Sequence, residues 1–108
     1  MDLPIPLEID VVTAAQWHRE GALLLDVREP FEVALCHVAG SQHVPMRQLP
    51  GLLAELPRDR TILAFCHTGV RSRRVTEYLR AQGFALVTNV AGGIDAWSEQ
   101  IDPSVARY

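Results

Sequence analysis

Cys66 begins the segment of this 108-residue chain that is best suited to chemistry, Cys66-His67-Thr68-Gly69-Val70-Arg71. The segment lies between a short apolar run and a long stretch with helical spacing. A loop that runs into the start of a helix can turn its backbone N–H groups inward, and these donors and the helix dipole favour an anion at their centre. A thiolate is such an anion, so we expect the Cys66 pKa to lie below the free value of about 8.5. The segment therefore predicts a nucleophilic cysteine.

Other residues of the segment suit an anion site. Gly69 permits a positive φ or a close approach of backbone, and Arg71 offers a permanent charge and a planar set of donors for an oxyanion substrate. We interpret His67 as lining the substrate mouth rather than as a general acid or base, because loop N–H groups already supply anion stabilisation. Arg73 and Arg74 are interpreted as solvated residues of a first helical turn.

Composition excludes several classes of protein. The formal net charge is −3, so there is no basic excess to neutralise nucleic acid. All ten basic residues are arginines, which excludes lysine Schiff bases and a P-loop lysine. The N-terminus resembles no signal peptide and no stretch is apolar enough to span a membrane, so we expect a cytoplasmic protein. Residues 1–108 are expected to form one domain, since the chain is too short for two cores.

Short apolar runs alternate with longer segments at helical spacing, which predicts an α/β protein with a largely parallel sheet. The runs at 23–26 and 61–65 are continuous rather than alternating, as is typical of strands covered on both faces, so we expect them to be central. The strands are predicted at about Leu7–Ile9, Leu23–Asp26, Gln42–Val44, Thr61–Phe65 and Leu86–Asn89.

Helices are predicted between these strands. Thr13 and Gln16 have capping-box spacing and predict a short helix through Glu20, which Gly21 ends. Pro30 suits the first turn of a helix over Phe31–Leu35. The remaining helices are predicted at Leu49–Leu56, bounded by Pro57, at Ser72–Gln82, bounded by Gly83, and from Gly92-Gly93 through Trp97.

Five side chains could in principle bind a metal: those of Cys36, His37, His43, Cys66 and His67. None of their spacings has two ligands separated by two to four residues, and adjacent side chains usually diverge. We expect no metal and no organic cofactor.

With these residues in view, the chain resembles the single-domain rhodanese-like sulfurtransferases. The resemblance extends over nearly the whole chain in the order and spacing of the family. The matching pieces are Leu25-Asp26-Val27-Arg28-Glu29-Pro30, His37-Val38-Ala39-Gly40-Ser41, the segment from Cys66 to Ser72, and Gly92-Gly93-Ile94-Asp95-Ala96-Trp97.

The resemblance implies a single rhodanese-like domain, a twisted parallel five-stranded sheet with helices on both faces. It implies that Cys66 is the nucleophile and carries sulfur as a persulfide, bound by the loop from His67 to Arg71. Asp26 and Arg28 match a family pair that we interpret as structural. Four residues separate Cys66 from Arg71, as in sulfurtransferases, whereas the related dual-specificity phosphatases have one residue more.

Two residues depart from the family pattern. Cys36 replaces a usual glycine and Ala39 a usual proline. We favour a packing role for Cys36; the alternative is a resolving cysteine that accepts sulfur from Cys66 or forms a disulfide with it. The residues from Asp95 to Tyr108 resemble, more weakly, the tails of rhodanese domains attached to E1-like adenylyltransferases, which suggests a protein acceptor.

Three functions remain open. The first is an enzyme that takes sulfur from thiosulfate or a persulfide donor and gives it, through Cys66, to cyanide, a thiol or a protein. The second is a persulfide relay module that serves a sulfur-carrier or E1-like partner protein. The third, disfavoured by the loop length, is a phosphatase or arsenate reductase that uses the same anion cradle.

Overall fold

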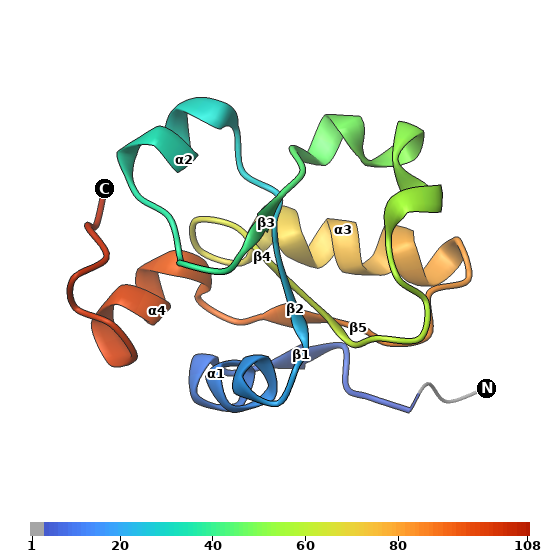
Figure 1. The fold of residues 1–108 in the computed structure, drawn as a ribbon, viewed down its shortest axis with the longest axis horizontal. Helices are drawn as coiled ribbons and strands as arrows, with labels where there is room; N and C mark the ends of the chain where they lie inside the picture. The colour runs from blue at the N-terminus through green and yellow to red at the C-terminus, as the bar shows by residue number, and fades with distance from the viewer. Residues whose placement is uncertain (1–3) are drawn as a thin grey trace.

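A computed structural model describes residues 4–108. Five parallel strands form one twisted sheet in the order β1-β5-β4-β2-β3 (Figure 1). This confirms the predicted fold class. The strands are β1 (Glu8–Ile9), β2 (Leu23–Asp26), β3 (Gln42–His43), β4 (Ile62–Phe65) and β5 (Val87–Val90).

Strands β2 and β4 lie in the interior of the sheet, as predicted. Every residue of both strands is buried, and they pair in register from Leu23 opposite Ile62 to Asp26 opposite Phe65. Leu24, Leu25 and Leu63 are fully buried, and each such side chain contributes about 1.5–3 kcal/mol relative to an exposed one. The strand that leads into Cys66 is therefore anchored on both faces.

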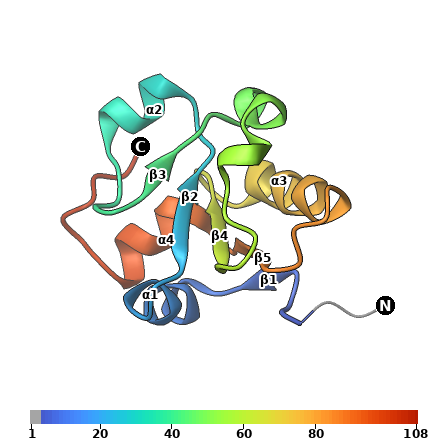
Figure 2. The same cartoon turned by 45° about the vertical axis from the view of Figure 1, so that its right-hand side comes forward.

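Helices cover both faces of the sheet (Figure 2). Trp97 and its neighbours in α4 pack with α1 on one face, and Val75 and Leu79 of α3 pack with Phe84 on the other. The helices are α1 (Val11–Arg19), α2 (Pro30–Leu35), α3 (Val70–Ala81) and α4 (Gly93–Gln100), with 3₁₀ turns η1 (Met46–Gly51) and η2 (Leu53–Glu55).

The start predicted for the first helix is wrong. Asp10, not Thr13, is the N-cap: its carboxylate accepts a hydrogen bond from the Thr13 N–H at 2.8 Å, and the helix begins at Val11. The Asp10 side chain satisfies a free N–H of the first turn, so Thr13 lies inside the helix.

The α-helix predicted over Leu49–Leu56 is also wrong, because the structure has two 3₁₀ turns there. Pro50 has no N–H to donate to a carbonyl four residues earlier. The chain instead makes i to i+3 bonds, such as that from Leu52 N–H to the Leu49 carbonyl at 2.9 Å.

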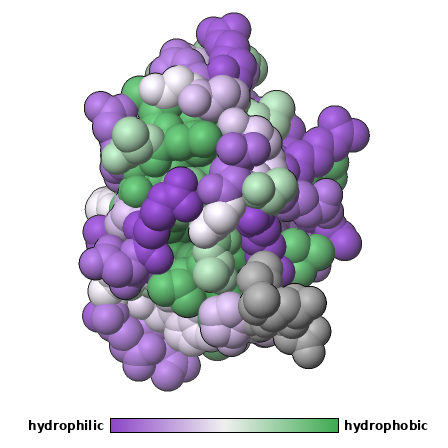
Figure 3. Space-filling model, turned by 90° about the vertical axis from the view of Figure 1, so that its right-hand side faces the viewer, coloured by the Kyte–Doolittle hydropathy of each residue, from purple (hydrophilic) through white to green (hydrophobic). Residues whose placement is uncertain are grey.

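The side of the molecule at the right of Figure 1 exposes hydrophobic residues between polar ones (Figure 3). Among residues 4–108, no helix is both long enough and apolar enough to cross a bilayer.

Candidate active site

Cys66 follows β4 directly and lies at the amino end of α3. Its side chain is only 1% exposed, and its sulfur is surrounded by donors. The Gly69 N–H lies 3.2 Å from Sγ, the Ser72 N–H 3.4 Å and the Ser72 hydroxyl 3.3 Å. The structure therefore places three hydrogen-bond donors around the Cys66 sulfur, an arrangement that we call the cradle.

These donors change the acidity of the thiol. Burial alone favours the neutral thiol, but hydrogen bonds from Ser72, Gly69 and Thr68 outweigh it and lower the Cys66 pKa. A larger fraction of Cys66 is therefore thiolate at neutral pH than for a free cysteine, and the thiolate is the nucleophilic form.

Gly69 ends the loop with a left-handed backbone, at φ +106°, as the sequence predicted. A Cβ at this position would meet the Gly92 amide nitrogen at 3.2 Å. Its conformation starts α3 at Val70, two residues earlier than predicted, so Arg71 and Ser72 lie in the first helical turn.

The first turn of α4 holds the other side of the loop. The Ile94 N–H donates to the Cys66 carbonyl at 2.8 Å, and the Asp95 N–H donates to the His67 carbonyl at 3.1 Å. Gly93, at φ +57°, allows this approach, since an added Cβ would lie 2.6 Å from the His67 carbonyl oxygen. Because the loop carbonyls are bonded to α4, the loop can direct its N–H groups toward the sulfur.

Ser72 and Asn89 belong to the site although sequence reasoning gave neither a role. The Ser72 hydroxyl lies 2.6 Å from Asn89 Oδ1, and Asn89 Nδ2 donates to the Gly69 carbonyl at 3.1 Å. Asn89 Nδ2 also donates to the Glu8 carboxylate at 2.8 Å. Strand β5 thus supports both ends of the cradle through one amide side chain. Its position in a buried strand is the one sequence signal for such a role, since a buried polar side chain needs partners.

Arg71 makes a contact that sequence reasoning missed. Its Nη1 and Nη2 atoms donate to the two carboxylate oxygens of Glu32, at 2.6 and 2.8 Å. The bond from Arg71 is the main reason that the Glu32 pKa falls to about 2, although burial opposes it. The Arg71 side chain remains one-third exposed.

The side chain of His67 packs against that of Tyr108. The rings of His67 and Tyr108 are stacked, with centroids 4.0 Å apart and planes inclined by 9°. The Tyr108 hydroxyl donates to Glu32 Oε2 at 2.7 Å and accepts from Arg28 Nη1 at 3.0 Å. No local pattern around Tyr108 indicates these contacts, because they join residues far apart in the sequence.

Asp26 and Arg28, the pair interpreted as structural, form an ion pair, with Arg28 Nη2 2.7 Å from Asp26 Oδ2. Both residues are fully buried. Arg28 also donates to the Cys36 carbonyl at 2.8 Å and lies 3.8 Å from the Cys36 sulfur. Cys36 caps the end of α2 and is almost completely buried, in agreement with the packing interpretation.

The exposed side of the loop borders a hollow of about 480 Å³. Thr68 and Val70 are exposed there. Arg73 is also exposed and pairs with Glu77 at 3.4 Å. The hollow is lined by Glu8, Thr68, Gly69, Val70, Arg73, Arg74, Glu77, Ala91 and Gly92.

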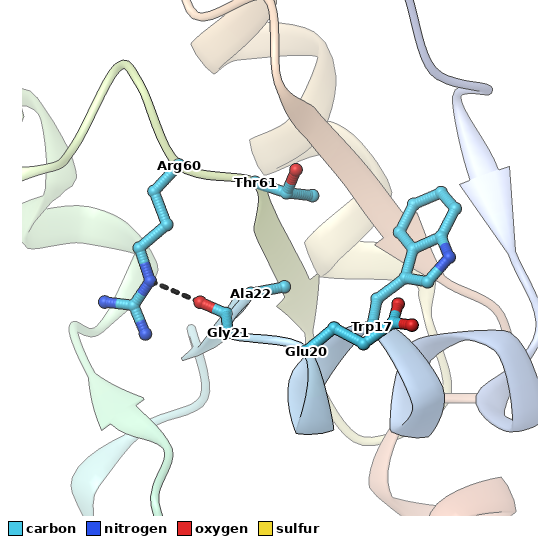
Figure 4. Close-up of a pocket in the computed structure, with 6 residues that line it drawn as sticks. All are labelled: Trp17, Glu20, Gly21, Ala22, Arg60 and Thr61. Atoms are coloured by element: carbon cyan, nitrogen blue, oxygen red, sulfur yellow. Dashed lines mark hydrogen bonds between the residues drawn. The ribbon is translucent and has the colours of Figure 1, made fainter.

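Another hollow, of about 340 Å³, lies at the amino ends of β2 and β4 (Figure 4). There Arg60 Nε donates to the Gly21 carbonyl at 2.6 Å. The residues that line this hollow precede β2 and β4, whereas Cys66 follows β4, so the hollow is separate from the candidate site. Within residues 4–108, no three His, Cys, Asp or Glu side chains are grouped so that they could hold a metal ion.

The family model of the rhodanese-like domain matches residues 10–100, and the chain belongs to this family. The rhodanese-related protein of Thermoplasma volcanium has a similar structure, with a TM-score of 0.82 and 30% identity over 95% of this chain and all of that one. The family resemblance is therefore confirmed.

Several curated relatives have sulfurtransferase names. A sulfurtransferase of Allochromatium vinosum is 38% identical over 87 residues, which are 81% of each chain. Thiosulfate sulfurtransferase GlpE of Stutzerimonas stutzeri is 34% identical over 71% of each chain. The probable adenylyltransferase/sulfurtransferase MoeZ of Mycobacterium tuberculosis is 38% identical over 79% of this chain but only 22% of its own. These relatives support a general sulfurtransferase function.

Proposed function

We propose that this protein is a rhodanese-type sulfurtransferase in which Cys66 carries a sulfane sulfur as a persulfide. One observation carries the proposal: a buried cysteine sulfur accepts hydrogen bonds from Gly69 and Ser72 at the start of α3. This environment stabilises an anionic sulfur, whether it is the thiolate or the persulfide.

The cycle has two displacement steps. The Cys66 thiolate attacks the outer sulfur of thiosulfate, a new S–S bond forms, the S–S bond of thiosulfate breaks, and sulfite leaves with the bonding electron pair. A thiophilic acceptor such as cyanide then attacks the outer sulfur of the persulfide. The bond to Cys66 breaks, thiocyanate leaves, and the thiolate is restored, so that no external oxidant or reductant is needed.

The loop from His67 to Arg71 binds the anions of this cycle in the proposal. The N–H groups of Thr68 and Gly69 stabilise charge on sulfur. Arg71 retains donors beyond the two that bind Glu32, since a guanidinium has five, and its partial exposure leaves them open to an anionic donor. His67, Thr68 and Val70 line the mouth.

Thiosulfate is the proposed small donor, and the name of the relative GlpE supports it. A persulfide donor would react by the same steps. The cycle requires reduced Cys66, which a cytoplasmic location would provide.

A persulfide relay is the second candidate, because the relative MoeZ is named as both an adenylyltransferase and a sulfurtransferase. In this case Cys66 passes its sulfur to a protein acceptor, such as a sulfur-carrier protein or an E1-like partner, and turnover with small acceptors is slow.

Intact-mass measurement tests the proposal. We expect thiosulfate to add one sulfur atom to the protein and cyanide to remove it. Cys66→Ser should show no gain, whereas Cys36→Ser, which removes the other thiol, should behave as the native chain. A gain that survives Cys66→Ser would refute the assignment. If thiosulfate fails and a low-molecular-weight persulfide loads Cys66, the relay is favoured; if both fail, hydrolysis of an oxyanion becomes the better hypothesis.

A further inference from the structure

Tyr108 connects the two flanks of the loop. Its ring stacks on His67, the residue after Cys66, and its hydroxyl donates to Glu32. Glu32 in turn binds Arg71 through both carboxylate oxygens. Figures 1 and 2 both show the C-terminal segment beside α2, the helix that contains Glu32. The His67 and Arg71 sides of the loop therefore share one wall.

The two sides of the loop differ in openness. On the Thr68 side the loop borders the hollow of about 480 Å³. On the His67 side the Tyr108 ring covers the imidazole at 4.0 Å, and Glu32 behind it is almost completely buried. A donor or acceptor that reaches Cys66 from the His67 side therefore meets an aromatic wall.

Several bonds fix the wall in place. The Tyr108 hydroxyl lies between Arg28 and Glu32, at 3.0 and 2.7 Å, and both partners are buried. Burial is the main cause that raises the Tyr108 pKa to about 12, so the hydroxyl keeps its proton at neutral pH. Stacked rings add about 0.5–1.5 kcal/mol beyond the area that they bury. Nearby Arg107 pairs instead with Asp95 at 3.0 Å.

We propose that Tyr108 is a specificity-determining residue, whose ring limits the size of the sulfur donors and acceptors that reach Cys66. The role in sulfur transfer rests on the proposed function. The effect on access to the thiol does not, because any reagent that approaches Cys66 from the His67 side meets the same wall.

Alkylation of Cys66 tests access without sulfur transfer. The rates with iodoacetamide, a small reagent, and with N-ethylmaleimide, a bulkier one, are measured at Cys66 by peptide mapping, which separates Cys66 from Cys36. Tyr108→Ala should raise the ratio of maleimide to iodoacetamide rates about tenfold, the scale on which one pocket wall discriminates ligands. Tyr108→Phe, which keeps the ring, and Arg107→Ala, which leaves Tyr108 in place, should keep the native ratio.

Single-turnover loading then tests specificity. Sulfur loading of Cys66 is measured with glutathione persulfide, a bulky donor, and with thiosulfate, a small one. Tyr108→Ala should raise the ratio of the first loading rate to the second about tenfold. An equal loss of loading rate with both donors would indicate a merely structural role for Tyr108. An unchanged alkylation ratio in Tyr108→Ala, or the same change in Tyr108→Phe, would overturn the proposal.

Two controls separate the possible failures. If Tyr108→Ala does not fold, Tyr108→Leu, which removes the flat ring but keeps apolar packing, makes the same comparison. If the native protein is never loaded with sulfur, the proposed function fails, while the alkylation ratio still decides whether Tyr108 limits access.

Discussion

The hydroxyl of Ser72 lies 3.3 Å from the sulfur of Cys66. It also lies 2.6 Å from Asn89 Oδ1, and its single proton serves one acceptor at a time. Asn89 and the Cys66 thiolate therefore compete for it. The Ser72 N–H, which faces the same sulfur, has no such competitor in the cradle.

Ser72→Ala should raise the Cys66 pKa, because it removes one donor and keeps the Ser72 backbone N–H. A net hydrogen bond is worth about 1 kcal/mol, so alkylation of Cys66 at neutral pH should slow about fivefold. The pH profile of alkylation measures the change. Ser98→Ala is the matched control, since Ser98 is also buried but donates to the Val105 carbonyl; an equal effect in both variants would contradict a direct role for Ser72.

Gly93→Ala should disrupt the loop. The added Cβ would clash with the Cys66 and His67 carbonyls, and residue 93 has φ +57°. We expect destabilisation of about 2 kcal/mol or more, seen as a lower urea midpoint, and loss of persulfide formation. Gly51→Ala is the control. Its added Cβ would meet no atom within 4 Å, so it should change neither the urea midpoint nor persulfide formation.

The Glu32–Arg71 pair should make stability depend on pH in acid. Glu32 has a pKa of about 2 in the folded protein instead of its ordinary 4.5. Because the folded pKa is the lower one, the contribution is fully present above about pH 4.5 and is lost as the pH falls toward 2. It amounts to at most about 3 kcal/mol. Urea unfolding of the native chain and of Glu32→Gln across this pH range measures the contribution. If the free energy of unfolding falls with pH in parallel in both chains, another group is responsible for the pH dependence.

Cys36→Ser should leave both sulfur loading and the Cys66 titration unchanged, because Cys36 packs beside Arg28 at the end of α2. A resolving cysteine would instead give the native chain a disulfide after oxidation of Cys66. Non-reducing mass analysis of both chains after mild oxidation distinguishes the two: a disulfide between Cys36 and Cys66 would replace the packing interpretation.

The sequence predicts most of the fold because β2 and β4, which pair in the middle of the sheet, are largely continuous apolar runs. The predicted bounds of β2, Leu23–Asp26, are those of the structure, and β4 differs from its predicted range only in lacking Thr61. Helix ends are less accurate, because side chains and backbone geometry decide them: Asp10 caps α1 and Gly69 starts α3. α4 extends to Gln100, beyond the predicted Trp97.

The loop from Cys66 to Arg71 is predicted because its residues are adjacent in the sequence. Its supports are not, because they come from distant segments. Asn89 follows Ser72 by 17 positions, Glu32 precedes Arg71 by 39, and Tyr108 follows Glu32 by 76. Such contacts arise from tertiary packing and leave no periodic pattern in the sequence.

The bond between Asn89 and Glu8 joins residues 81 positions apart, and the amide of Ile94 must be in place to hold the Cys66 carbonyl. An unfolded chain therefore carries Cys66 as an ordinary thiol, with a pKa of about 8.5, largely protonated and slow to oxidise. The hydrogen bonds that lower the pKa of this sulfur exist only in the folded chain, so folding and the acidity of Cys66 are coupled.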